Sequence, residues 1–299
     1  MVRDAGIVAR FELAESLRSR RALVLLMLHI AGSVASTLVF IEILGEIEAA
    51  LANTLGVAAT STPGTMSGTL MKSDAFLDVV TGLVGSPTVA AEVVAIPPVA
   101  LFYGATALFV VPVLVALGSS DVIAAERATG SIRYALFRTD RTSWVMGKFA
   151  GQAALLGIGI AGGAAAVWVT GLSELADFDM LANALWLARL GGRAWIFGLC
   201  WLGITLGVSQ LTRSVHWARG LAVVALMGAG MVNIVLQSRF AVRHLGAVAD
   251  TLHSLTPAAQ RMELWRPDLW DRLPPTVLLV AIGGAALALG HQRLLRADA

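Results

Sequence analysis

Charged and apolar side chains alternate at helical spacing in residues 119–149, which contain the string SDVIAAERATGSIRYALFRTDRTSWVMGKF. Asp121 follows two serines and is a candidate N-cap for a helix. Gly130 would interrupt that helix, at about 1 kcal/mol relative to alanine, which predicts a bend and then a short helix near Ser131–Arg138. Such a helix could dock a soluble partner through its charged and apolar side chains. A solvated basic loop fits the same residue types, so the chemistry of this segment alone leaves both interpretations open.

Motifs that would mark an enzyme are missing from the sequence. It contains no GxxxxGK[ST] phosphate loop, no HExxH, no GxSxG and no CxxC. The five histidines are scattered and show no metal-ligand spacing. We therefore expect no enzyme, although an intramembrane active site built from distant segments would leave no local pattern.

The composition is that of an integral membrane protein. Of 299 residues, 57% are hydrophobic and only 14% are charged, whereas soluble domains are about 25% charged. The net charge of +2 leaves no basic surface for nucleic acid, and the apolar content excludes a disordered chain. The single cysteine, Cys200, excludes an intrachain disulfide.

Six stretches are apolar and long enough to cross a bilayer core of about 30 Å as helices. They are Ala22–Ile43, Ile96–Ser119, Phe149–Thr170, Ala194–Gln210, Gly220–Gln237 and Pro275–Gly290. We predict an all-α membrane protein in which residues 1–299 form a single transmembrane domain. No Asp, Glu, Lys or Arg falls at the predicted middle of a span, which disfavours a proton-driven transporter.

The distribution of basic residues predicts the orientation. Fourteen of the 22 lie in residues 1–21, in the loop 119–148 and in the other segments on the same side of the six spans. Both termini are therefore expected in the cytoplasm, with residues 44–95 and 238–274 as extracytoplasmic loops. Five arginines in 238–274 run against this placement of the last hairpin. Arginine outnumbers lysine 20 to 2, a composition typical of GC-rich bacteria, so the predicted location is the bacterial cytoplasmic (inner) membrane.

Residues 1–21 predict an amphipathic "elbow" helix lying in the membrane interface rather than a cleavable signal. Apolar residues recur there at helical spacing, and arginines are placed to meet lipid headgroups. The candidate membrane-interface residues are Arg10, Arg18, Arg20, Arg21 and, after the loop, Lys148. A plain basic anchor that only fixes topology remains the alternative.

The loop resembles that of type-2 ABC transporter permeases, the membrane subunits of ABC exporters. The residues that follow the family pattern in order are Asp121, Glu126, Arg127, Gly130, Ser131, Leu136, Arg141, Gly147 and Lys148. Thr139 and Asp140 replace the usual proline, which puts the local turn geometry in question. Residues 9–26, 209–223 and 255–265 are similar to the family's elbow, its link between spans four and five, and its segment before the last span.

The resemblance implies that a separate ATP-hydrolysing subunit binds the short helix after span two, called a coupling helix. ATP and Mg would then be bound by that partner, and this chain would hold no cofactor. On this interpretation, charged contacts to the ATPase come from Glu126, Arg127, Arg133 and Arg141, while Ile132, Leu136 and Phe137 fill its groove. Arg138 and Lys148 are alternatively placed to bind lipid phosphates.

Three functions remain open at this stage. The first is an exporter permease that pairs with a second copy or a paralogue and moves an apolar or amphipathic cargo. The second is a permease-like scaffold that transmits ATP-driven motion to an extracytoplasmic partner. The third is an intramembrane enzyme, which the missing motifs disfavour. The sequence does not identify the cargo.

Overall fold

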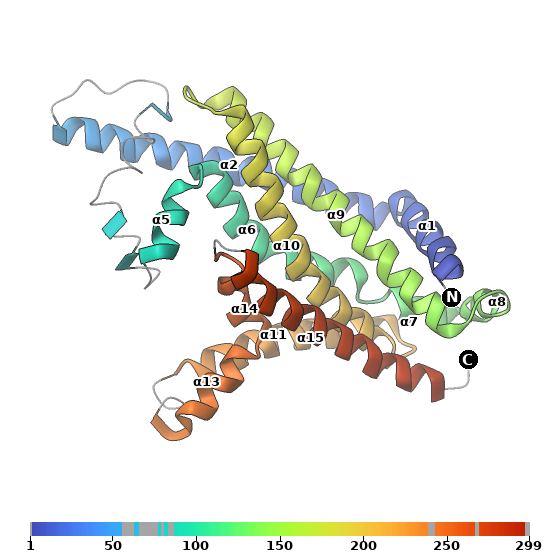
Figure 1. Ribbon diagram of the computed structural model, residues 1–299. Coiled ribbons are helices and arrows are strands. Elements are labelled where there is room, and N and C mark those ends of the chain that lie inside the picture. The colour runs from blue at the N-terminus through green and yellow to red at the C-terminus, as the bar shows by residue number, and fades with distance from the viewer. Residues whose placement is uncertain are drawn as a thin grey trace. The chain divides into compact units, whose positions relative to one another are not determined.

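A computed structural model describes residues 2–55, 63–65, 77–78, 81–82, 87–238, 243–266 and 269–296. Every element within these ranges is a helix, drawn in Figure 1. Six of the described helices are long and apolar enough to cross a membrane: Arg20–Ala50, Pro98–Thr129, Arg141–Glu174, Met180–Ser209, Val215–Leu236 and Leu269–Arg296. This confirms the predicted all-α membrane protein with six spans and an additional N-terminal helix.

The helices form two compact units. Unit one comprises Met1–Leu25, Leu108–Ile158 and Trp195–Ala299. Its complete helices are α1 (Val2–Arg18), α7 (Val122–Thr129), α8 (Ile132–Leu136), α11 (Val215–Leu236), α13 (Ala247–Ser254), α14 (Pro257–Glu263) and α15 (Leu269–Arg296). Unit two comprises Leu26–Ala107 and Gly159–Ala194, and contains α5 (Pro87–Ala95). Four long helices contribute to both units: α2 (Arg20–Leu55), α6 (Pro98–Ser119), α9 (Arg141–Glu174) and α10 (Met180–Ser209).

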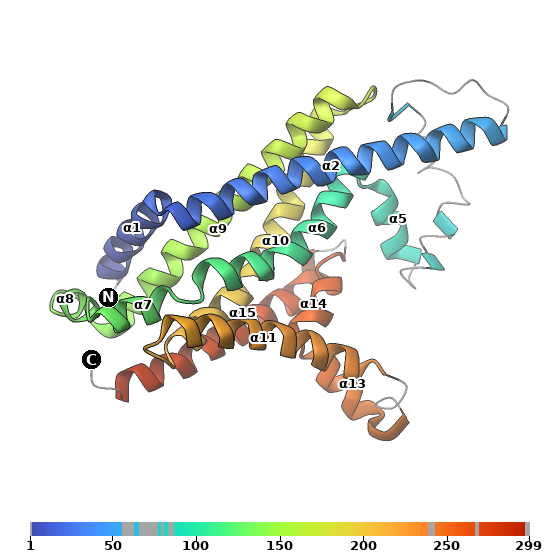
Figure 2. The same cartoon turned by 180° about the vertical axis from the view of Figure 1, so that it is seen from behind.

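Within unit one, α10 and α15 approach so closely that only glycine fits at their crossing. A Cβ atom on Gly203 would collide with the backbone of Gly283, and one on Gly283 would lie 2.9 Å from the Cα atom of Cys200. Small residues at a helix crossing let the two backbones approach and pack in the bilayer. This contact holds the second half of α10 against the last helix, as both views show (Figures 1 and 2).

The helix α2 is longer than the predicted span Ala22–Ile43. It has 36 residues, or about 54 Å at 1.5 Å per residue, against about 30 Å for the hydrocarbon core. Beyond Ile43, the alanines, glutamates and leucines continue the helix because they are strong helix formers even where they are not uniformly apolar. In unit two, Glu48 of this extension is buried and accepts a hydrogen bond from the backbone N–H of Gly64 (2.9 Å). Part of the predicted loop 44–95 is therefore helix, and much of the remainder lies outside the described residues.

The helix α10 begins at Met180, fourteen residues before the predicted span Ala194–Gln210. Asp179 starts it, since its carboxylate accepts a hydrogen bond from the backbone N–H of Ala182 (2.9 Å). The helix therefore includes Arg189 and Arg193, and Arg193 lies near its middle with 7% of its surface exposed. The helix α10 therefore includes two arginines that the predicted span Ala194–Gln210 left out, because they shortened the apolar stretch that defined it.

Candidate functional site

The segment between α6 and α9 folds as two short helices, α7 and α8, joined at Gly130. Gly130 has φ of +75°, the left-handed conformation that glycine adopts without strain, and it ends α7. The next helix, α8, covers Ile132–Leu136. The predicted bend and short helix are confirmed. In both ribbon views α7 and α8 lie at the same end of unit one as α1 and the last turn of α15 (Figures 1 and 2).

Asp140 caps the start of α9, at the place where the permease loop pattern has a proline. Its Oδ1 accepts a hydrogen bond from the backbone N–H of Ser143 (2.8 Å), and its Oδ2 accepts one from the Ser143 hydroxyl (2.6 Å). These two hydrogen bonds cap the first turn of α9 and lower the pKa of Asp140 below its ordinary value. The substitution of the proline therefore leaves a well-defined helix start.

The tip of the loop exposes two aromatic side chains. Phe137 is 84% exposed and Tyr134 is 77% exposed, and Arg133 and Arg138 beside them are also exposed. Phe137 and Arg133 lie where the docking hypothesis needs them. The sequence analysis did not select Tyr134, because the periodicity argument considered only apolar residues. Its aromatic side chain is the signal that could have found it, since exposed aromatics are typical of protein interfaces.

Ile132 has a different environment from the one predicted for it. It is 3% exposed and belongs to the core of this unit, and Leu136 is half-buried. Ile132 therefore anchors α8 to its own chain and does not fill a groove on another protein. The amphipathic pattern located the apolar face of α8 but did not show which side of the helix faces outward.

Lys148 lies inside the protein rather than at a lipid surface. Its ammonium group forms ion pairs with Glu12 of α1 and Glu126 of α7, and only 5% of its side chain is exposed. The Glu12 side chain is 6% exposed and that of Glu126 25%. The predicted lipid contact of Lys148 and the predicted partner contact of Glu126 are therefore replaced by an internal cluster that joins α1, α7 and α9.

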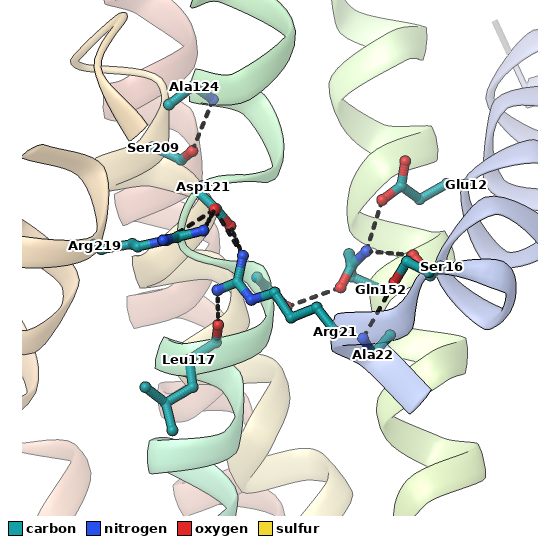
Figure 3. Close-up of polar contacts among 12 residues, drawn as sticks. Glu12, Ser16, Arg21, Ala22, Leu117, Asp121, Ala124, Gln152, Ser209 and Arg219 are labelled. Carbon is teal, nitrogen blue, oxygen red and sulfur yellow. Dashed lines mark hydrogen bonds and ion pairs between the residues drawn. The ribbon is translucent and has the colours of Figure 1, made fainter. Parts of the chain in front are cut away.

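Gln152, one turn after Lys148, extends this cluster (Figure 3). Its Nε2 donates to Glu12 Oε1 (2.6 Å) and to the Ser16 hydroxyl (3.0 Å), while its Oε1 accepts from Ser119 at the end of α6 (2.9 Å). Glu12, Lys148, Glu126 and Gln152 are called the elbow cluster below. Sequence reasoning missed Glu12 because a buried glutamate in an interfacial helix has no local signature. The signal that could have found it is its place four residues after Val8 on the packed face of α1.

The elbow helix packs against α9 without a gap. A Cβ atom on Gly151 would lie 2.7 Å from the Glu12 Cβ atom, and one on Gly147 would lie 2.5 Å from the Val8 Cβ atom. Ile7 and Phe11 point away from this contact and are 59% and 68% exposed. The amphipathic α1 therefore has one face fixed to α9 and one apolar face free for lipid. Arg10, Arg18 and Arg20 are exposed, as an interfacial position requires.

Asp121 lies at the N-cap position of α7, yet its side chain makes no capping hydrogen bond. Its carboxylate instead forms ion pairs with Arg21 and Arg219, each at 2.6 Å (Figure 3). The Asp121 side chain is 8% exposed, while those of Arg21 and Arg219 are 39% and 47% exposed. The carboxylate therefore joins the starts of α2 and α11 to the start of α7.

Three arginines donate to backbone carbonyls at helix ends. Arg21 donates to the carbonyl of Leu117, and Arg127 donates to those of Gln210 and Thr212, the latter at 3.3 Å. Arg141 donates to the carbonyls of Leu294 (2.8 Å) and Leu295 (2.9 Å). Arg127 and Arg141, predicted as ATPase contacts, thus bind within their own chain. No group of three or more His, Cys, Asp or Glu suited to a metal ion occurs in the part of the chain that the structure describes.

The whole arrangement is a mechanical junction. At this end of unit one, α1, α7 and α9 are joined to neighbours through charged or polar side chains, whereas α8 is anchored by the apolar Ile132 and carries exposed aromatics. These contacts hold the loop and the helix ends together. At the same end of unit one, the Thr142 hydroxyl at the start of α9 is hydrogen-bonded to His291 Nε2 near the end of α15 (3.0 Å).

Comparison with known proteins agrees with this geometry. No curated protein matches the chain. Residues 7–266 match the family described as ABC-2 family transporter protein, a match that begins in α1 and includes α7, α8 and the elbow cluster. The chain therefore belongs to the ABC-2 transporter family and is a multi-pass membrane permease component of an ABC transporter, in a family that works with a separate ATP-binding subunit.

Proposed function

We propose that this chain is the export permease of a bacterial inner-membrane ABC transporter and that its ATP-binding subunit docks on α8. The observation that carries the proposal is the exposure of Tyr134 (77%) and Phe137 (84%) on a helix whose other side is anchored by buried Ile132. Aromatic side chains of this kind contribute most of the energy at protein interfaces. ATP and Mg are bound by the partner, and both termini of this chain and the loop 119–148 face the cytoplasm.

Co-purification tests this docking. In the double variant Tyr134→Ala/Phe137→Ala, we expect the amount of ATP-binding subunit that co-purifies per permease to fall about tenfold or more, because two exposed aromatic side chains are lost. Trp270→Ala is the matched control, because Trp270 is equally exposed (79%) but lies in the first turn of α15. Equal retention by the double variant and the control would contradict docking at α8.

Labelling tests the sidedness separately. Cys200 is the single cysteine and is buried, so Cys200→Ala gives a background for reporter cysteines. Phe137→Cys in that background should react with a membrane-impermeant maleimide in inside-out vesicles and stay unreactive in intact spheroplasts. Reaction from the outside would place the loop on the wrong face for an ATPase.

Pairing with a second copy of this chain is supported by α11. Its buried residues are Ala218 and Ala222, whereas Val224, Met227, Met231 and Ile234 are 65–70% exposed at helical spacing. In a bilayer such a stripe contacts lipid or another helix. We expect Met227→Cys, in the Cys200→Ala background, to form a cross-linked dimer with a short bis-maleimide. Arg219→Cys, on the same helix, is the control for random collision.

A scaffold that works an extracytoplasmic partner is the second candidate, and the length of α2 favours it. About 24 Å of this helix exceeds the hydrocarbon core, and it presents Ile43 and Ile47, each 49% exposed. A photo-crosslinking residue at Ile47 should capture an extracytoplasmic protein if the scaffold function holds. ATP-dependent uptake of an amphipathic probe into inside-out vesicles, without any such protein, supports the exporter.

A further inference from the structure

Three long helices end within unit one beside the loop, and an arginine from elsewhere in the chain binds carbonyls at each of these ends. Arg21 binds a carbonyl in the last turn of α6, Arg127 binds that of Gln210 directly after α10, and Arg141 binds carbonyls in the last turn of α15. The partners are separated by 96, 83 and 153 residues in sequence, so local folding does not bring them together. The same kind of contact, from an arginine to a carbonyl at a helix end, therefore occurs three times in this part of the chain.

The physical reason for an arginine at these places is the helix terminus itself. The last four carbonyls of a helix have no partner within the helix, and the helix dipole makes that end partially negative. A guanidinium group has five N–H donors and a permanent positive charge, so it satisfies two carbonyls at once, as Arg141 does at Leu294 and Leu295. The contact fixes both the distance and the angle between the arginine's own element and the helix end.

The three arginines come from the elements that hold the loop. Arg21 lies in the first turn of α2, directly after the elbow helix; Arg127 lies in α7; and Arg141 is the first residue of α9, directly after the loop. Through the elbow cluster, α1, α7 and α9 are themselves joined. The ends of α10 and α15 are therefore connected to the loop through Arg127 and Arg141, while the end of α6 is connected to it both through Arg21 and directly through the chain at Ser120–Asp121.

We propose that Arg21, Arg127 and Arg141 are positioning residues for coupling, each fastening the end of one transmembrane helix to the elements that carry the loop. This inference rests on the proposed docking of the ATP-binding subunit at α8. Each arginine delivers the motion of the loop to its own helix: Arg21 to α6, Arg127 to α10 and Arg141 to α15. None of the three contacts the ATPase.

The test is hydrogen exchange on the permease–ATPase complex in nanodiscs, with and without ATP and Mg. The quantity compared is the ATP-dependent change in exchange at the last two turns of α6, α10 and α15. We expect Arg141→Gln to keep the ATPase bound and to lower the ATP response of α15 at least about threefold, while α6 and α10 respond as in the wild type. Arg127→Gln should do the same for α10 alone.

Two further variants separate positioning from stability and charge. Arg141→Lys keeps a positive charge at the carbonyls and should restore most of the α15 response. Arg293→Gln is the matched control, since Arg293 is an exposed arginine in the last turn of α15, and it should leave all three responses intact. A loss spread equally over the three helices, or an unchanged α15 response in Arg141→Gln, would overturn the inference. A wild-type permease that retains no ATPase would instead overturn the proposed function.

Discussion

The two short helices of the loop, α7 and α8, use their charged and apolar residues in opposite ways. In α7 the charged residues turn inward, since Glu126 pairs with Lys148 and Arg127 binds the end of α10. In α8 the exposed residues are Arg133 and Tyr134, followed by Phe137 at the C-cap, and the buried residue is Ile132. The two helices are separated by one left-handed glycine and a serine, so the eight attached residues of α7 are followed directly by the proposed docking helix.

The charged residues of α7 therefore attach the loop to its own chain, whereas the exposed side chains in and just after α8 make no such attachment. An exposed ion pair contributes little to affinity or stability, whereas a buried one is costly to break. The proposed docking needs both a rigid attachment and an accessible surface. Residues 122–129 provide the attachment, and Tyr134 and Phe137 are accessible.

The largest effect is expected from breaking the attachment at Lys148. Lys148→Met leaves Glu12 and Glu126 as carboxylates beside an apolar side chain, and removing one member of a buried ion pair costs about 3–5 kcal/mol. The Tm of the solubilised protein should fall accordingly.

The charge-balanced control sharpens this prediction. The triple variant Glu12→Gln/Glu126→Gln/Lys148→Met removes all three charges and should recover a large part of the lost Tm, because no unpaired charge remains buried. Equal Tm values for wild type and Lys148→Met would mean that the cluster is hydrated and that α7 is not held by it.

Two substitutions within α8 sharpen the contrast between its faces. Ile132→Ala removes a side chain that is 3% exposed and should cost about 2–5 kcal/mol of stability. Tyr134→Ala removes one that is 77% exposed and should change stability by no more than about 0.5 kcal/mol. Thermal unfolding measures both, and ATPase retention should show the reverse order. Similar Tm losses would indicate that both faces of α8 are packed.

A smaller effect is expected at Asp121. Its carboxylate is buried, but the side chains of Arg21 and Arg219 are 39% and 47% exposed. Water can therefore solvate both arginines when asparagine replaces Asp121. Asp121→Asn should therefore cost about 1–2 kcal/mol, less than Lys148→Met. Arg219→Gln, which removes one of the two cations, is the comparison, and its Tm loss should be smaller still. A larger loss for Arg219→Gln would mean that the arginine has a role apart from Asp121.

The fold followed from the sequence where the signal is local. Apolar runs located six spans, and Gly130 marked the bend, because helix length and left-handed backbone depend on residues close together. The extra turns of α2 and α10 were missed because polar helix formers and two arginines end an apolar run without ending a helix.

The sequence could predict which residues belong to the site but not which of them interact, because the interacting residues are distant from one another in the chain. Glu12 and Lys148 are 136 residues apart, and Arg141 is 153 residues from Leu294. The sequence does not distinguish an arginine that binds a carbonyl of its own chain from one that binds a partner protein. The loop pattern singled out Glu126, Arg127 and Arg141, and the structure adds contacts within the chain that the pattern did not predict.

The smallest effect is expected at Asp140, which is exposed between α8 and α9 and caps α9. Its folded-state pKa is lowered by hydrogen bonds from Ser143, so its contribution is fully present above the ordinary aspartate pKa of 3.8 and is lost as pH falls through the lower folded value. Asp140→Asn keeps an acceptor for the Ser143 N–H and removes the titration. The Tm of the variant should lie close to that of wild type at pH 7, and the small gap should narrow as the pH falls below 3.8. Asp78 or Glu42 variants would not reproduce this convergence, because neither caps α9. If the gap widened as the pH fell, the cap would be acting through the protonated carboxyl, and the junction between loop and helix would depend on a different hydrogen bond from the one at Ser143.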